Sequence, residues 1–144
     1  MKLVSVLVLL FLAQISIAQS NNSAQVARGK YLVQRVAMCG DCHTPRDDKG
    51  MPLPGKELAG APLGFKPLAP MPWATTAPEI AGLPGWKDAQ IVTFLTTGKL
   101  DGRAPNPPMP EYRLSAADAR AVVAYLRTLG GAGAKNQKST ATAK

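Results

Sequence analysis

Apolar and polar positions along the chain predict three helices separated by two proline-rich segments. All 13 prolines lie between Pro45 and Pro84 or between Pro105 and Pro110. Because proline removes a backbone donor and disrupts helix interiors, helices are expected only outside these two stretches. The predicted fold class is therefore all-α, with long loops rich in proline and glycine.

The first predicted helix runs from about Ser23, a candidate N-cap, to Cys39. Gly29 lies near its apolar face, where glycine costs about 1 kcal/mol of helix propensity relative to alanine. That cost suggests a close contact between Gly29 and another element. The apolar face itself recurs at helical spacing and consists of Val26, Leu32, Val33 and Val36.

The second predicted helix covers about residues 88–97. Lys87 is a poor N-cap, so its start is less sharply marked than its end, where Gly98 suits a left-handed C-cap. Its inward positions are Ile91, Phe94 and Leu95.

The third predicted helix follows Ser115, whose hydroxyl is expected to cap the amide of Asp118. The short Asp118 carboxylate partly mimics the reciprocal half of a capping box. Gly130 and Gly131 are expected to stop the helix. Its apolar positions are Val122, Tyr125, Leu126 and Leu129.

The N-terminal residues resemble an export signal. Lys2 precedes an apolar run, and Ser16-Ile17-Ala18 places small residues where a signal peptidase cleaves. An uncleaved membrane anchor is the rival interpretation, but the run is shorter than the roughly 20 residues a spanning helix needs. We expect residues 1–18 to be a cleaved signal peptide, with cleavage after Ala24 as a weaker alternative. Residues 19–130 would form one domain and residues 131–144 a disordered basic tail.

The net charge of +8 at pH 7 includes three lysines of the tail, so the predicted domain is only mildly basic. No basic stripe interleaved with aromatic residues is present, which argues against nucleic-acid binding. Export places the mature chain in the periplasm, an oxidising compartment.

Both cysteines and the only histidine of the chain, Cys39, Cys42 and His43, form a C-x-x-C-H motif at the end of the first predicted helix. Each thiol can add to a vinyl group of haem, and the imidazole can reach the iron from the same side. The stretch of about forty residues from Thr44 to Trp86 has no convincing long element, and a large cofactor would fill the centre of such a chain. The motif therefore predicts one covalently attached haem c.

Three other uses of such a motif fit the sequence less well. A structural disulfide would leave His43 without a role and would not account for the missing core. A zinc site needs about four protein ligands, and no further cysteine or histidine exists. A thioredoxin-like motif should lie at a strand-to-helix junction of a βαβ unit, which the pattern does not show.

The second axial ligand of the iron cannot be another histidine, so methionine is the expected class. Met38 adjoins the motif on the proximal side, and Met51 follows it after only a short loop. Met71 and Met109 are both flanked by prolines, which favour a stiff loop. Met109 is preferred because the chain before it is long enough to pass round the haem and return on its far face; Met71 remains the alternative.

Three segments together resemble the class I c-type cytochromes, particularly small bacterial monohaem domains also found as cytochrome subunits of periplasmic dehydrogenases: ARGKYLVQRVAMCGDCHTPRD, GWKDAQIVTFLTTG and DGRAPNPPMPEYRLSAADARAVVAYLRTL. The resemblance implies the cytochrome c fold, with three or more helices packed around one covalently bound haem. It also implies that Cys39 and Cys42 are the thioether attachments, that His43 is the proximal ligand and that Met109 is the distal ligand.

The resemblance further implies a helix-crossing contact between Gly29 and Tyr125. Trp73, Trp86 and Tyr112 are candidates to line the haem crevice or to bind the propionates, and the sequence assigns none of them a role.

The function expected from these residues is one-electron transfer rather than catalysis. A periplasmic cytochrome would carry electrons between a donor dehydrogenase or membrane complex and a terminal acceptor. It would meet redox partner proteins at the exposed haem edge, without nucleic acid or a small-molecule substrate and with weak membrane association at most. The alternative is a haem protein with an open or labile sixth site, acting as a gas sensor or weak peroxidase.

Overall fold

The computed structural model describes the backbone of residues 22–137 and the side chains of residues 22–130. The expected signal peptide and the last seven residues of the expected tail lie outside this part of the chain. An α-helix covers residues 22–31 and continues into the π-helical turn η1 (Leu32–Val36). The later elements are α2 (Gly40–His43), β1 (Ala61–Pro62), β2 (Thr76–Ala77), α3 (Asp88–Thr97) and α4 (Ala116–Gln137).

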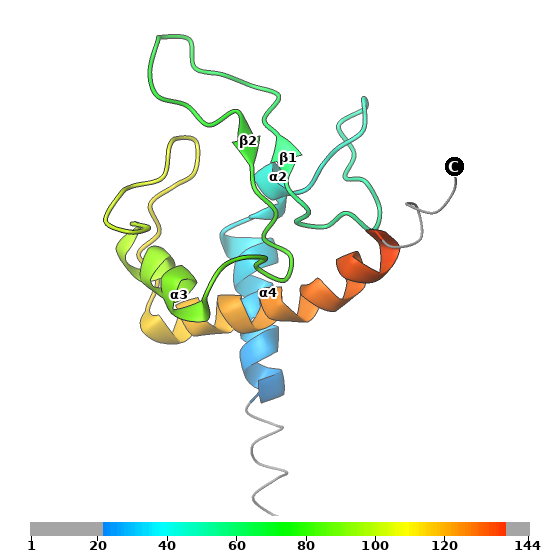
Figure 1. Ribbon diagram of the computed structural model, residues 1–144, viewed down its shortest axis with the longest axis vertical. Coiled ribbons are helices and arrows are strands. Elements are labelled where there is room, and N and C mark those ends of the chain that lie inside the picture. The colour runs from blue at the N-terminus through cyan, green and yellow to red at the C-terminus, as the bar shows by residue number, and fades with distance from the viewer. Residues whose placement is uncertain (1–21, 138–144) are drawn as a thin grey trace, which may run out of the picture.

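Helix α4 is the element against which the other long helices pack. It lies across the first helix and packs against both η1 and α3 (Figure 1). Apolar side chains of these elements and of the loops around Leu58 and Leu83 form the core. Its buried members are Leu32, Val33, Leu58, Leu83, Ile91, Leu95, Ala119, Val122, Val123, Tyr125 and Leu126.

The first helix differs from the continuous helix expected up to Cys39. The amide of Ala37 donates to the carbonyl of Leu32 over 2.8 Å, a wider turn than that of an α-helix, and Met38 has a φ of 47°. The wider turn changes which side chains face inward. Val33 is 1% exposed as expected, whereas the prediction that Val36 faces the core is wrong, because Val36 is 52% exposed.

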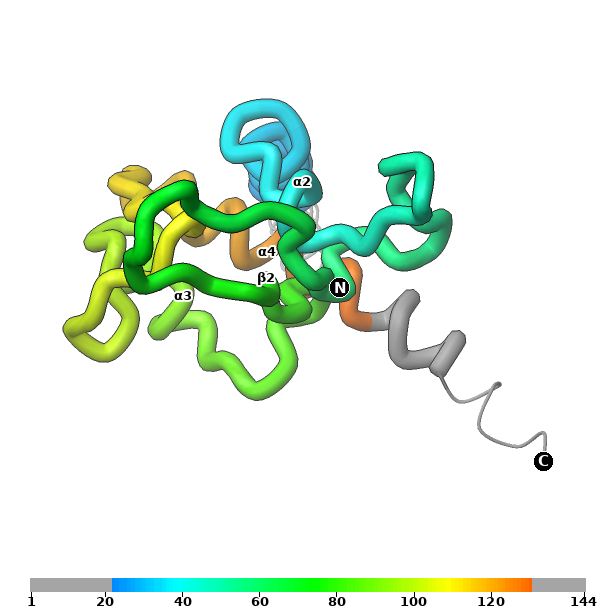
Figure 2. Tube along the Cα trace, turned by 90° about the horizontal axis from the view of Figure 1, so that it is seen from above, coloured from blue at the N-terminus to red at the C-terminus, as the bar shows by residue number. Residues whose placement is uncertain are grey.

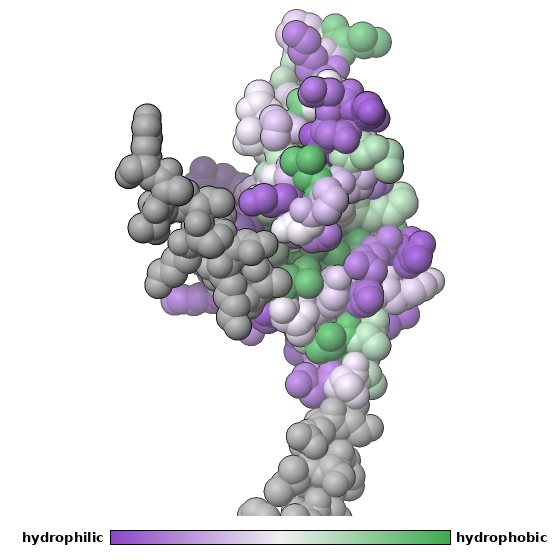
Figure 3. Space-filling model, turned by 90° about the vertical axis from the view of Figure 1, so that its right-hand side faces the viewer, coloured by the Kyte–Doolittle hydropathy of each residue, from purple (hydrophilic) through white to green (hydrophobic). Residues whose placement is uncertain are grey.

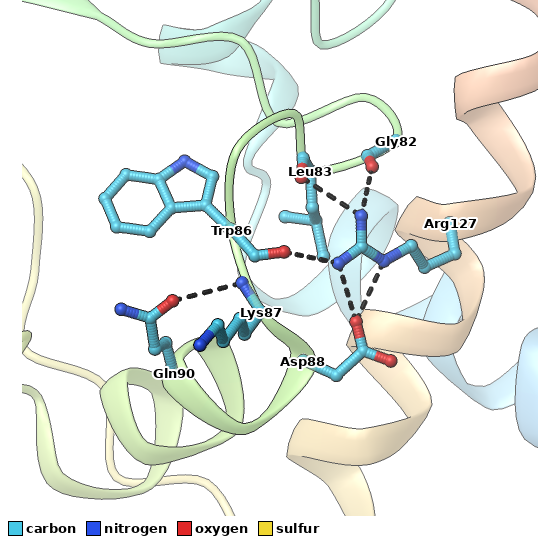
Figure 4. Close-up of polar contacts among 7 residues, drawn as sticks. All are labelled: Gly82, Leu83, Trp86, Lys87, Asp88, Gln90 and Arg127. Atoms are coloured by element: carbon cyan, nitrogen blue, oxygen red, sulfur yellow. Dashed lines mark hydrogen bonds and ion pairs between the residues drawn. The ribbon is translucent and has the colours of Figure 1, made fainter.

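Helix α3 has the predicted bounds and the predicted left-handed C-cap, with Gly98 at a φ of 69°. Although Lys87 is a poor N-cap, a side-chain hydrogen bond stabilises the start of this helix. The side-chain Oε1 of Gln90 accepts a hydrogen bond of 3.1 Å from the amide of Lys87 (Figure 4). This bond supplies the reciprocal half of a capping box.

Helix α4 begins as predicted, with the Ser115 hydroxyl oxygen accepting a hydrogen bond of 3.1 Å from the amide of Asp118. The Asp118 carboxylate does not complete the expected capping box; it pairs with Arg28, whose Nε lies 2.8 Å from Oδ1. The helix also continues past Gly130 to Gln137 rather than stopping at the glycine pair. Glycine weakens a helix without removing its backbone hydrogen bonds, and at Gly130 the bare α-carbon fits against Gly82.

Two short strands modify the all-α prediction. Ala61 pairs with Ala77 and Pro62 with Thr76 in antiparallel register, and the amide of Leu63 donates to the carbonyl of Thr75 over 2.8 Å. This pairing closes a long loop of residues 63–75. Seen from above, that loop reaches across the molecule while α2 lies between it and the loop that follows α2 (Figure 2).

The loops that surround α2 all project to one side of α4 (Figure 1). The molecule's surface mixes hydrophobic and hydrophilic residues on the face drawn in Figure 3. Among the helices of the described residues, none combines the length and the apolar character needed to cross a bilayer.

Candidate functional site

The C-x-x-C-H motif forms the short helix α2 and the residue before it. The amide of His43 donates to the carbonyl of Cys39 over 2.9 Å, and Cys39 itself has helical dihedral angles. Positions separated by three or four residues share one face of a helix. The local fold therefore directs the side chains of Cys39, Cys42 and His43 toward one side.

Both cysteines are free thiols and are half-buried. Burial raises the pKa of the Cys39 thiol to about 11, helped by the nearby charges of Cys42 and Asp41 and opposed by a backbone hydrogen bond. Cys39 is therefore protonated at neutral pH. Thiolates rather than thiols bind metals and attack disulfides, so this environment does not favour a zinc ligand or a thioredoxin-like nucleophile.

His43 is held in a single orientation. Its side chain is 5% exposed, and its Nδ1 lies 2.7 Å from the carbonyl oxygen of Pro78. A carbonyl only accepts hydrogen bonds, so Nδ1 carries the proton and Nε2 keeps its lone pair. In the described part of the chain, Nε2 makes no hydrogen bond, and no buried side-chain nitrogen or oxygen lacks a partner. Nε2 therefore faces accessible space.

The charge state of His43 suits a metal ligand. Burial lowers the pKa of the imidazole, although the hydrogen bond to Pro78 opposes this shift. The ring is therefore neutral at neutral pH. A neutral imidazole whose second nitrogen donates to a backbone carbonyl is the usual arrangement of a histidine that binds a metal.

The chain after His43 is tied to the loop around Leu58. The Oγ1 of Thr44, which is 6% exposed, accepts a hydrogen bond of 3.0 Å from the amide of Leu58. The amide of Gly60 donates to the carbonyl of His43 over 2.8 Å. These two bonds fix the backbone that carries the imidazole. Neither bond could be predicted from the sequence, because each joins two separate segments of the chain.

Met109 is the least exposed of the four methionines in the described residues. It is half-buried, whereas Met38, Met51 and Met71 are each at least 50% exposed. The amide of Ala74 donates to the carbonyl of Pro107 over 2.8 Å, which attaches the Met109 loop to the long loop of residues 63–75. Met71 and Met109 thus lie on loops that touch each other.

Tyr112 is the site residue that sequence reasoning left unassigned. Its hydroxyl donates a hydrogen bond of 3.0 Å to the carbonyl of Ala37, two residues before Cys39. Burial raises the pKa of Tyr112 to about 12, and the nearby charges of Cys39 and Cys42 add to the shift. Tyr112 therefore lies close to both cysteines.

The two tryptophans have different surroundings. Trp86 packs against the core. Trp73 donates from Nε1 to the carbonyl of Phe65 over 3.2 Å, and its ring meets that of Phe65 edge-to-face at 5.9 Å. Neither contact reaches the C-x-x-C-H motif.

The residues present fit a covalently held porphyrin. Two free thiols and a neutral imidazole lie on α2 and the residue before it. The loops that follow leave large apolar side chains uncovered, as an apolar ligand requires. Within residues 22–130, no three side chains of histidine, cysteine, aspartate or glutamate converge on a common metal position. The uncovered side chains of these loops are Met51, Leu53, Phe65, Leu68 and Met71.

The chain matches a known protein family over most of its length. The sequence pattern of the family described as cytochrome C oxidase, cbb3-type, subunit III matches residues 24–126. That range contains Cys39, Cys42, His43, Met109 and Tyr112.

Several curated proteins are similar to this chain. The fructose dehydrogenase cytochrome subunit of Gluconobacter japonicus is 38% identical over 108 residues, which cover 71% of this chain and 21% of that protein. The cytochrome c subunit of alcohol dehydrogenase (quinone) from Gluconobacter oxydans is 34% identical over 123 residues, covering 77% of this chain and 25% of that protein. A diheme cytochrome c-type protein of Cereibacter sphaeroides is 28% identical over 117 residues, covering 77% of this chain and 38% of that protein. The chain thus spans well under half the length of these relatives.

Proposed function

Because the chain belongs to the c-type cytochrome family that matches residues 24–126, an electron-transfer family with the cytochrome c fold, we propose that it is a periplasmic carrier of single electrons with one haem c. The observation that carries this proposal is the state of His43. It is buried and neutral, its Nδ1 is engaged by Pro78, and its Nε2 is left with a lone pair.

In this proposal Cys39 and Cys42 form the two thioether bonds and His43 is the proximal ligand. The half-buried, protonated Cys39 supports a thiol that adds to a vinyl group rather than one that binds a metal ion. A single C-x-x-C-H motif occurs in these 144 residues, which supports one haem for this chain.

Met109 is the proposed distal ligand. Its lower exposure supports this choice over Met71, which is 50% exposed. When bound, the haem supplies an iron that alternates between ferric and ferrous states, and thioether ligation favours the ferrous state. His43 and Met109 would both hold the iron, which would leave no site there for a substrate.

The proposed partners are proteins that donate and accept electrons at the exposed haem edge. Two similar proteins are named as cytochrome subunits of dehydrogenases, which supports a dehydrogenase as the donor. We expect small, salt-sensitive, transient contacts, because redox complexes bury little surface and depend on electrostatic steering.

The test is the absorption spectrum of the protein produced with c-type haem maturation machinery, in the ferric and ferrous states. Met109→Ala is compared with Met71→Ala, a matched control that removes a thioether from the neighbouring loop. We expect covalent haem in all three proteins and a ferric sulfur-to-iron charge-transfer band that only Met109→Ala abolishes.

Other outcomes would change or refute the proposal. Loss of the band in Met71→Ala alone would move the distal ligand to Met71. A parent protein without the band that binds carbon monoxide rapidly when ferrous would favour the open-site sensor or peroxidase. Absence of covalent haem would refute the proposal as a whole.

A further inference from the structure

The two proposed axial ligands stand on separate segments of the chain. His43 belongs to residues 37–43, and Met109 belongs to the loop of residues 106–114. The second segment is anchored at both ends away from the motif, by Pro107 to Ala74 over 2.8 Å and by Leu114 to Leu95 over 2.9 Å. The residues between these two anchors, which include Met109, must be held in place by other contacts.

One hydrogen bond joins the two segments directly. The hydroxyl of Tyr112 donates to the carbonyl of Ala37 over 3.0 Å, and within residues 22–130 no other hydrogen bond connects residues 37–43 with residues 106–114. Tyr112 is also half-buried and packs against the core cluster. Its ring can therefore remain in place by packing while its hydroxyl adds a directional bond.

We propose that the Tyr112 hydroxyl is a positioning group. Its hydrogen bond attaches the Met109 loop to the segment preceding Cys39 and thereby slows the replacement of the distal ligand by an external ligand. This inference rests on the proposed function, because it takes Met109 as that ligand. Tyr112 does not bind the iron; it acts through the loop that carries Met109.

The physical argument concerns the opening of the loop. An external ligand can replace the methionine only when the loop moves away, and that movement breaks the bond between Tyr112 and Ala37. A neutral hydrogen bond contributes modestly to a folded state, so its removal should increase the open population by about 3- to 10-fold. Packing of the phenyl ring would be unaffected.

The experiment measures imidazole binding to the ferric, haem-loaded protein. Imidazole competes with methionine for the iron, and at saturating imidazole the rate of exchange reports how fast the methionine leaves. Tyr112→Phe removes only the hydroxyl. The matched control is Tyr125→Phe, which removes a half-buried hydroxyl that accepts a 2.9 Å bond from Gln34 at the helix crossing.

We expect Tyr112→Phe to retain the sulfur-to-iron band, to bind imidazole about 3- to 10-fold more tightly and to exchange faster at saturation. Tyr125→Phe should behave as the parent does. Equal imidazole binding by Tyr112→Phe and the parent would overturn the inference, as would equal increases in both variants, which would indicate general loosening. A parent without the band would instead refute Met109 as the ligand, so the two failures are distinguishable.

Discussion

Gly29 lies against Tyr125 so closely that a β-carbon on Gly29 would stand 2.8 Å from the β-carbon of Tyr125. The same added carbon would lie 2.6 Å from the carbonyl carbon of Ala121. The first helix and α4 therefore cross with their backbones almost in contact. This confirms the contact that the glycine in the first helix and the family resemblance suggested.

Gly29→Ala should destabilise the protein by about 2 kcal/mol. An overpacked contact costs up to about 3 kcal/mol, and the better helix propensity of alanine returns about 1 kcal/mol. The clash dominates because backbone atoms of α4 cannot rotate away. Chemical denaturation of the haem-loaded protein measures the loss, and Gly64→Ala is the control because no atom lies within 4 Å of its added β-carbon. Equal stability of the two variants would contradict this reasoning.

Thr44→Val should lower the free energy of unfolding by about 1–3 kcal/mol. Valine has nearly the same shape, but it leaves the buried amide of Leu58 without its acceptor, which lies 3.0 Å away. The control is Thr93→Val, at an exposed threonine whose hydroxyl makes no hydrogen bond within residues 22–130. Unfolding by guanidinium measures both variants, and no loss in Thr44→Val would show that Leu58 finds another acceptor.

Arg127 joins α4 to the loop that leads into α3. Its guanidinium donates to the carbonyls of Gly82 and Trp86, each over 2.6 Å, and pairs with the Asp88 carboxylate at 2.7 Å (Figure 4). A further bond of 3.0 Å goes to the carbonyl of Leu83. The planar guanidinium thus serves several acceptors that the single ammonium group of lysine cannot reach together.

Arg127→Lys should therefore cost about 1–3 kcal/mol, because several charge-assisted hydrogen bonds are lost while the charge is kept. Thermal or chemical unfolding of the haem-loaded protein measures the change. Arg120→Lys provides the comparison, since the Arg120 side chain makes no hydrogen bond or ion pair within residues 22–130. If both substitutions had the same small effect, the bonds of Arg127 would contribute little.

The ion pair between Arg28 and Asp118 should make the stability of the folded protein depend on pH in a definite direction. Hydrogen bonding from Arg28 holds the pKa of Asp118 below its ordinary value. The folded state therefore favours the ionised carboxylate of Asp118. The resulting stabilisation is fully present above about pH 4, the pKa of an aspartate in the unfolded chain. It is lost as the pH falls through the lower pKa that Asp118 has in the folded protein. The effect should be small, because Arg28 is exposed and Asp118 is only partly buried, so water screens the pair.

Asp118→Asn should accordingly be less stable than the parent at pH 7, and the difference should shrink as the pH falls below about 4. Urea unfolding midpoints across this range measure it, with Asp48→Asn as the control, since Asp48 makes no ion pair or side-chain hydrogen bond within residues 22–130. A difference that stayed constant with pH would exclude the ion pair as its source.

Much of the secondary structure could be predicted because it depends on neighbours in the sequence. Gly98 at the end of α3 and Ser115 before α4 act on amides only a few residues away, and the apolar positions of both helices recur at a fixed spacing. Gly130 does not mark the end of the last helix, contrary to the prediction from the sequence. It lowers helix propensity, but it also allows contact with Gly82, and α4 continues beyond it.

The chemistry of the site could be predicted from neighbouring residues, because C-x-x-C-H gathers two thiols and an imidazole within five residues. Family membership follows from this pattern and its surroundings. The roles of Cys39, Cys42, His43 and Met109 as haem ligands remain predictions for the spectra to test.

The contacts between distant parts of the chain could not be predicted and are known only from the three-dimensional structure. The Nδ1 of His43 meets Pro78, Tyr112 meets Ala37, and Arg28 rather than a capping box receives Asp118. The exposure of Val36 and the pairing of β1 with β2 are likewise features that the sequence did not predict. Each depends on the path of loops through space, and local spacing carries no information about which distant carbonyl or carboxylate a side chain will reach.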